Sequence, residues 1–147
     1  MIQKLNKNRA GFTLVEIMIV VAIIALLAAI AVPNFLRARK RSQATRILED
    51  LRIIDSAIDQ YAIENNKPAG AIANWADMQK YLKAGSPLYN STGKDLLGNV
   101  FGSEHQDGSN EIGQQFQVDG VVHIQTATFE ALSDVAPLEF WSPYRIH

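Results

Sequence analysis

An unbroken apolar run in the first third of the chain constrains the fold most strongly. Every residue from Ile17 to Val32 is apolar. As a helix rising about 1.5 Å per residue, the wider segment 12–36 is long enough to cross a hydrocarbon core of about 30 Å. Glu16 lies at the leading edge of the run, with Phe12 and Leu14 before it. A charge inside a membrane helix costs about 2.5–3.5 kcal/mol on insertion scales, so this carboxylate needs a physical reason.

The apolar run continues into an amphipathic pattern. Large apolar residues recur at helical spacings of 4, 3, 4 and 3, at positions Ile47, Leu51, Ile54, Ile58 and Tyr61. This periodicity predicts one helix from about Phe12 to Glu64. We expect a kink near Pro33, because proline removes a helix donor. The helix would divide into a membrane or assembly half, 12–36, and a second half, 37–66, that rests on a head domain, 67–147.

The head sequence predicts short elements. Asn74 is a good N-cap for a helix over 75–84, and Thr128 for a last short helix. We expect a strand at 97–101 and a hairpin in which Asp119-Gly120 joins strands 114–118 and 121–125. The predicted fold class is therefore α+β: one long N-terminal helix packed on a small antiparallel sheet.

The near-neutral net charge of −1 conceals two opposite halves. Residues 1–52 hold nine Lys or Arg against three Asp or Glu (+6), whereas residues 53–147 hold five against twelve (−7). Four of the cations form a basic neck directly after the apolar run: Arg37, Arg39, Lys40 and Arg41. The neck suits anionic lipid headgroups, the acidic heads of neighbouring copies or plain solvent. The chain contains no cysteine, so no disulfide frames the fold.

A secretory signal peptide is the competing interpretation of the N-terminus. Residues 1–11 would be its basic region, 12–28 its apolar region, and Ala-Ile-Ala at 29–31 its cleavage site, which would release a soluble binding protein starting near Val32. The apolar run exceeds the usual length of about 7–15 residues, and a signal peptide gains nothing from Glu16. Basic residues flank the run on both sides, so charge alone leaves the membrane topology open.

Residues 10–35, AGFTLVEIMIVVAIIALLAAIAVPNF, resemble the N-terminus of the type IV pilin superfamily, which includes the pseudopilins of type II secretion. The matching positions are Gly11, Phe12, Thr13, Leu14, Glu16 and Pro33. The resemblance covers about residues 4–40, and its motif is highly specific.

The resemblance implies a set of roles. A prepilin peptidase would remove leader 1–11 by cutting between Gly11 and Phe12, and would N-methylate Phe12. Glu16 would pair with the new amine of a neighbouring subunit during assembly, and the helix would loosen near Pro33. The protein would be a single-pass inner-membrane protein with a cytoplasmic N-terminus and a periplasmic head, later moving into a filament. Its partners would be copies of itself, related subunits, membrane lipid, the peptidase and an inner-membrane platform of the secretion or pilus system.

The head carries no recognisable enzyme motif, and we expect neither catalysis, nor an organic cofactor, nor nucleic-acid binding. Its three histidines stand in unrelated contexts. One oxygen-rich cluster offers ligands suited to calcium, at Glu104, Asp107, Asn110 and Glu111, although the spacing is not that of an EF-hand. An ordinary acidic loop is the preferred interpretation, and a calcium site is the alternative.

The segment KDLLGNVF bears on the choice within the superfamily. It is similar to the DPWGNPY-like segment of major pseudopilins through Asp95, Gly98 and Asn99, but lacks the proline and tryptophan. Many pilins close their C-terminal region with paired cysteines, which this chain does not have. We therefore predict a pseudopilus subunit for type II secretion. The alternative is a type IV pilus subunit for adhesion, motility or DNA uptake.

Overall fold

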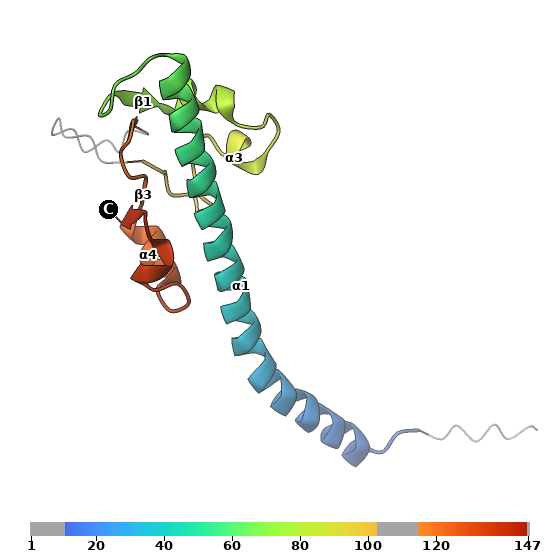
Figure 1. Cartoon of the computed structure of the whole chain (residues 1–147). Coiled ribbons are helices and arrows are strands. Elements are labelled where there is room, and N and C mark those ends of the chain that lie inside the picture. The colour runs from blue at the N-terminus through green and yellow to red at the C-terminus, as the bar shows by residue number, and fades with distance from the viewer. Residues whose placement is uncertain (1–10, 103–114, 147) are drawn as a thin grey trace, which may run out of the picture. The chain divides into compact units, whose positions relative to one another are not determined.

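The computed structural model describes residues 11–102 and 115–146. Helix α1, Leu14–Glu64, spans 51 residues (Figure 1). The chain divides into two compact units, Met1–Arg37 and Ala38–His147, so α1 contributes to both. The prediction of one long N-terminal helix joined to a small α+β head is confirmed.

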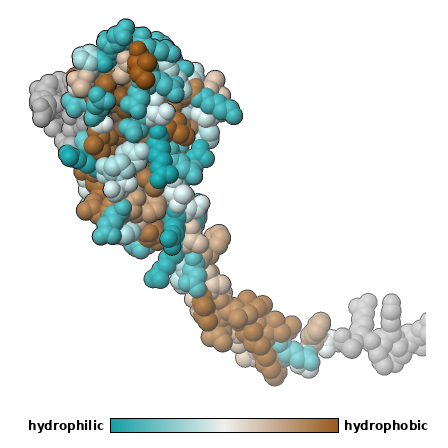
Figure 2. Space-filling model, viewed as in Figure 1, coloured by the Kyte–Doolittle hydropathy of each residue, from teal (hydrophilic) through white to brown (hydrophobic). Residues whose placement is uncertain are grey.

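The first unit contains the apolar part of α1. Among the described residues, α1 is the one helix long and apolar enough to cross a membrane. Its large apolar side chains from Phe12 to Leu36 are all exposed. Figure 2 shows most of this part of the helix as a brown surface, with a teal patch near its N-terminal end. The helix continues without interruption across Pro33.

The second unit is built on the remaining turns of α1, against which the head elements pack (Figure 1). The predicted apolar stripe is buried at all five positions: Ile47, Leu51, Ile54, Ile58 and Tyr61. Trp75, Met78 and Leu82 join the same core, as the spacing of these residues predicts. Trp141 is fully buried, and its Nε1 donates to the carbonyl of Ala136 at 3.2 Å. Both tryptophans therefore pack in the core.

The head elements are short. In chain order they are β1 (Ile72–Asn74), α2 (Trp75–Met78), the 3-10 helix η1 (Gln79–Tyr81), α3 (Pro87–Asn90), β2 (Gln115–Gln117), β3 (His123–Ile124), α4 (Thr126–Leu132), the 3-10 helix η2 (Leu138–Trp141) and β4 (Arg145–Ile146). Asn74 is the N-cap of α2, as predicted, and its N–H donates to the Asp77 carboxylate at 3.2 Å. The helix predicted over 75–84 is shorter than expected and ends as η1.

Two small sheets hold the head together. Strands β1 and β2 pair antiparallel, with Ala73 opposite Phe116 at the centre. Strands β3 and β4 pair parallel, with His123 opposite Arg145 and Ile124 opposite Ile146. The antiparallel sheet was predicted, whereas the parallel pair was not.

The predicted hairpin at Asp119-Gly120 is wrong. The turn exists: Asp119 has a φ of +59°, and the N–H of Gly120 donates to the carbonyl of Gln117 at 2.9 Å. The strands on either side of it pair with different partners, β2 with β1 and β3 with β4. The turn at Asp119-Gly120 is therefore predicted correctly from local residues. The pairing of the two strands is not, because it depends on which buried faces of distant segments meet.

Two further local predictions are wrong. Segment 97–101 is not a strand, although Val100 forms an isolated bridge with Lys94. The chain turns here because the Asp95 carboxylate accepts the N–H groups of Leu97 and Asn99. Thr128 is not a helix cap: Gln125 is the N-cap of α4, and Thr128 lies buried inside that helix.

Candidate assembly site

Helix α1 begins with a reciprocal capping box. The N–H of Thr13 donates to Oε2 of Glu16 at 2.8 Å, and the N–H of Glu16 donates to Oγ1 of Thr13 at 3.2 Å. The pair satisfies two of the four N–H groups that a helix leaves free at its start. This contact was not among the features predicted from sequence, although the Thr-x-x-Glu spacing is its recognised signal. In this chain Glu16 therefore caps its own helix.

Capping leaves Glu16 able to bind a second donor. An ionised carboxylate offers about four lone-pair sites, of which the Thr13 N–H occupies one. The side chain is exposed and lies at the N-terminal end of the helix dipole, where a negative charge interacts favourably with the free N–H groups. A cation brought to this end of α1 can therefore pair with Glu16 without breaking the cap.

The residues before the helix are accessible. Gly11 and Phe12 precede α1, and 84% of Phe12 is exposed. Apart from its chain neighbours, no heavy atom of the described residues lies within 4 Å of the position that a Cβ on Gly11 would occupy. A side chain at position 11 would therefore meet no other residue that the structure describes.

The surface behind this end is apolar over a long distance. Pro33, the fourth of the predicted site residues, lies about five helical turns beyond Glu16. All large apolar side chains between these two positions are exposed. Contiguous apolar surface of this size is not stable in water and marks a membrane or protein contact.

In the head, a buried polar cluster links the Asp95 turn to α4. One Asp95 oxygen accepts the N–H groups of Leu97 and Asn99 at 2.8 and 3.0 Å, and the other accepts the Thr128 hydroxyl. The Asn99 side chain donates to the same hydroxyl at 2.9 Å. Since Asp95 and Thr128 are both buried, these bonds replace water that the two groups lost on folding.

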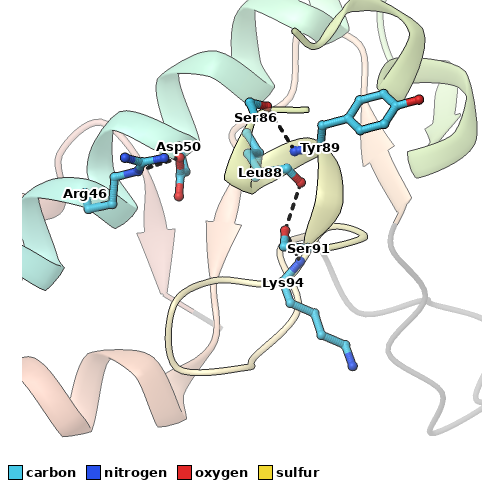
Figure 3. Close-up of polar contacts among 7 residues, drawn as sticks. All are labelled: Arg46, Asp50, Ser86, Leu88, Tyr89, Ser91 and Lys94. Atoms are coloured by element: carbon cyan, nitrogen blue, oxygen red, sulfur yellow. Dashed lines mark hydrogen bonds and ion pairs between the residues drawn. The ribbon is translucent and has the colours of Figure 1, made fainter. Parts of the chain in front are cut away.

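A second buried carboxylate lies on α1 facing the α3 region. Asp50 is 4% exposed and accepts a hydrogen bond from Nε of Arg46 at 3.3 Å (Figure 3). Burial raises the pKa of Asp50; Arg46 opposes the shift, while the nearby charge of Asp95 adds to it.

In the adjoining loop, the Ser86 hydroxyl accepts the Tyr89 N–H at 3.2 Å, which caps α3 (Figure 3). The arrangement stabilises the head and contains no nucleophile–base pair.

The predicted calcium ligands Glu104, Asp107, Asn110 and Glu111 lie outside the described residues. Within residues 11–102 and 115–146, no group of three or more His, Asp or Glu side chains is placed to hold a metal ion. The calcium site stays a prediction.

Residues 6–32 match the family described as Prokaryotic N-terminal methylation motif. This match spans Gly11, Phe12, Thr13 and Glu16, the residues at the start of α1. The N-terminal segment is a prepilin-type methylation motif. The resemblance to the type IV pilin superfamily is thereby confirmed for this part of the chain.

Curated relatives of this chain include both type IV pilus proteins and type II secretion proteins. A type IV wide pilus major component, PilA4 of Thermus thermophilus, is 47% identical over 60 residues, which are 41% of this chain and 46% of the relative. The type II secretion system core protein G of Aeromonas hydrophila is 31% identical over 62 residues, 42% of this chain and 43% of the relative. A type IV major fimbrial protein FimA of Dichelobacter nodosus is 36% identical over 81 residues, 55% of this chain and 52% of the relative.

The chain thus spans about half the length of the curated relatives it matches. No solved structure matches it significantly.

Proposed function

We propose that this protein is a pilin-like structural subunit that assembles through the apolar half of α1 into a filament. The exposed apolar surface behind the Thr13–Glu16 capping box carries this proposal. Such a surface is covered by lipid in the monomer and by the same helices of other copies in the filament. The role is structural rather than catalytic, in keeping with the pilus and secretion-system names of the relatives.

The processing and topology follow the same proposal. A prepilin peptidase cuts between Gly11 and Phe12 on the cytoplasmic side and methylates Phe12. The subunit then waits in the inner membrane with its head in the periplasm. On assembly, the Phe12 amine of one copy pairs with Glu16 of its neighbour, which compensates a charge that would be costly alone in an apolar layer. We retain leader 1–11, helix halves 12–36 and 37–66, and head 67–147 as the proposed domain division.

Within the superfamily, we propose a pseudopilus subunit that acts in type II protein secretion. Asp95, Gly98 and Asn99 support this choice, because they are the positions that this segment shares with the similar segment of major pseudopilins. In this chain the three residues form a tight turn. The core protein G relatives agree with it. The relatives PilA4 and FimA favour the second candidate, a type IV pilus subunit.

The N-terminal mass of the mature protein is the first experiment. A chain that starts at methylated Phe12 and sediments with sheared filaments supports the proposal, whereas a soluble chain that starts near Val32 contradicts it. Deletion of the gene then separates the two candidates. Loss of secreted proteins from the medium with normal surface motility supports the pseudopilus; loss of motility or DNA uptake with normal secretion supports the pilus.

A further inference from the structure

The basic neck divides its cations between two environments. Lys40 is engaged with its own head, since its Nζ lies 3.0 Å from Oδ1 of Asp134. Arg39 and Arg41, on either side of it, are exposed. Neither arginine forms a salt bridge with any residue that the structure describes. Successive helix residues are about 100° apart, so the two guanidinium groups flank the Lys40 contact and stay free to bind another molecule.

An open groove on the head carries the opposite charge. It has a volume of about 710 Å³ and lies between the last turns of α1 and the turn after β2. Asp59 from α1 and Asp119 from the turn line it, and both side chains are exposed. Lys67 also lines the groove, yet neither carboxylate forms a salt bridge within the described part of the chain.

Lys67 offsets the charge of only one of the two carboxylates that line the groove, so the groove keeps a net negative charge. Asp55 lies one turn before Asp59 on α1, and like charges at this spacing repel each other. Burial raises the pKa of Asp55, and the Asp59 charge raises it further. The groove therefore favours a cation from outside.

The groove also offers an apolar contact. Ile63 of α1 lines it and is 77% exposed, the largest exposure of any large apolar residue in the described part of the second unit, Ala38–His147. An arginine fits such a site well, because its methylene stem covers apolar surface while the guanidinium reaches a carboxylate.

We propose that this groove binds the neck arginines, Arg39 and Arg41, of a second copy of the chain. The inference rests on the proposed function, which anchors all copies in parallel through α1. Within one chain, Arg41 and Arg39 lie 18 and 20 residues before Asp59 on α1. Parallel copies make the contact only when they are displaced along the helix by about 27–30 Å.

The contact between the neck of one copy and the groove of another can repeat from copy to copy. Each copy offers one neck and one groove, so a bound pair still has a free neck at one end and a free groove at the other. Such head-to-tail contacts build open filaments rather than closed dimers. The contact would set the axial spacing of heads outside the core, independently of the pairing at Glu16.

Cross-linking tests the proposal directly, because the full-length chain contains no cysteine of its own. Ser42, next to Arg41, and Lys67, in the groove, are both exposed. The double variant Ser42→Cys, Lys67→Cys should give a ladder of cross-linked oligomers under a short bis-maleimide in assembling cells. Each single variant should give no species larger than a dimer. The matched control joins Ser42→Cys to Lys83→Cys, an exposed position outside the groove, and should give no ladder.

A charge exchange provides the second readout. Arg41→Asp and Asp59→Arg should each weaken subunit addition about two- to five-fold, the value of one exposed ion pair, and reduce sheared filaments accordingly. The combined Arg41→Asp, Asp59→Arg chain should recover filament yield, because it restores the pair with its signs reversed. Lys83→Asp, a charge change elsewhere on the head, should leave the yield unchanged.

Two outcomes overturn the inference while leaving the proposed function intact. One is wild-type filaments without the Ser42–Lys67 ladder. The other is loss of membrane-bound monomer on Arg41→Asp with normal filaments on Asp59→Arg, which would assign the neck to anionic lipid. A wild-type chain that is never processed at Gly11 and never forms filaments would instead refute the proposed function itself.

Discussion

Glu16 has two roles that a single set of substitutions can separate: it caps its own helix, and it is proposed to bind the Phe12 amine of a neighbour. Glu16→Gln removes the charge but keeps a side-chain oxygen at the same reach. In the wild-type chain the Thr13 N–H donates to the Glu16 carboxylate at 2.8 Å. The glutamine side-chain oxygen can still accept this hydrogen bond, since glutamine serves in a capping box as glutamate does. Thr13→Ala does the reverse: it removes the oxygen that accepts the Glu16 N–H at 3.2 Å and leaves the charge.

The expected magnitudes differ clearly. Loss of the Thr13 cap costs about 1 kcal/mol of helix stability. Leaving the Phe12 amine without its charge partner in an apolar layer costs roughly 3–5 kcal/mol for each added subunit, which weakens addition by about a hundred-fold or more. Glu16→Gln should therefore abolish filaments while processed monomer accumulates in the membrane. Thr13→Ala should retain most filaments.

The assay is fractionation into membrane and sheared-filament pools, with the N-terminal mass read in each. Both variants should be cleaved at Gly11, which separates assembly from insertion and processing. Abundant filaments from Glu16→Gln, together with their loss in Thr13→Ala, would mean that Glu16 acts only as a helix cap. The register role of the carboxylate would then be refuted.

Four further predictions concern processing and the head, the latter measured on fragment 38–147. Gly11→Val should leave a full-length membrane precursor, because a side chain added next to the Gly11–Phe12 bond, where it meets no other described residue beyond its neighbours, should obstruct the peptidase; normal cleavage would show that the cleavage site is misplaced. Thr128→Val should lower the free energy of unfolding by about 1–3 kcal/mol, because Asp95 loses a buried donor, whereas the exposed control Thr126→Val should change it little. The pKa of Asp50 is raised above its ordinary 3.8 in the folded head, so this carboxyl group binds protons more readily in the folded than in the unfolded state. Its contribution to stability therefore falls as the pH rises from 3.8 through the raised pKa. Relative to Asp50→Asn, the wild-type head should thus lose stability in urea titrations as the pH rises above 3.8; a pH-independent difference between the two would contradict this. Millimolar calcium should raise the melting temperature of the head if Glu104, Asp107, Asn110 and Glu111 bind it, and identical curves with chelator would remove the site.

The sequence alone determined the long helix, its two faces and the N-terminal methylation motif. These features are periodic or local: an apolar run, a stripe at spacings of three and four, and a short motif that needs no distant partner. Ile47 and Tyr61 at the ends of the stripe are both buried, as their spacing predicts. The capping box of Thr13 and Glu16 was equally readable, since its two residues are only three positions apart.

Only the tertiary structure decided how the head closes. Asp119 indicated a turn correctly, but strand pairing depends on which buried faces meet, and β2 pairs with β1, which lies more than forty residues earlier in the chain. Thr128 is a residue type that often caps helices, but here its hydroxyl donates in the core to Asp95, which lies 33 positions earlier in the chain. The cations of the basic neck are likewise distinguished only by the fold. In the sequence they form a run of equivalent charges. In the structure Asp134 pairs with Lys40, while the neighbouring arginines form no salt bridge among the described residues.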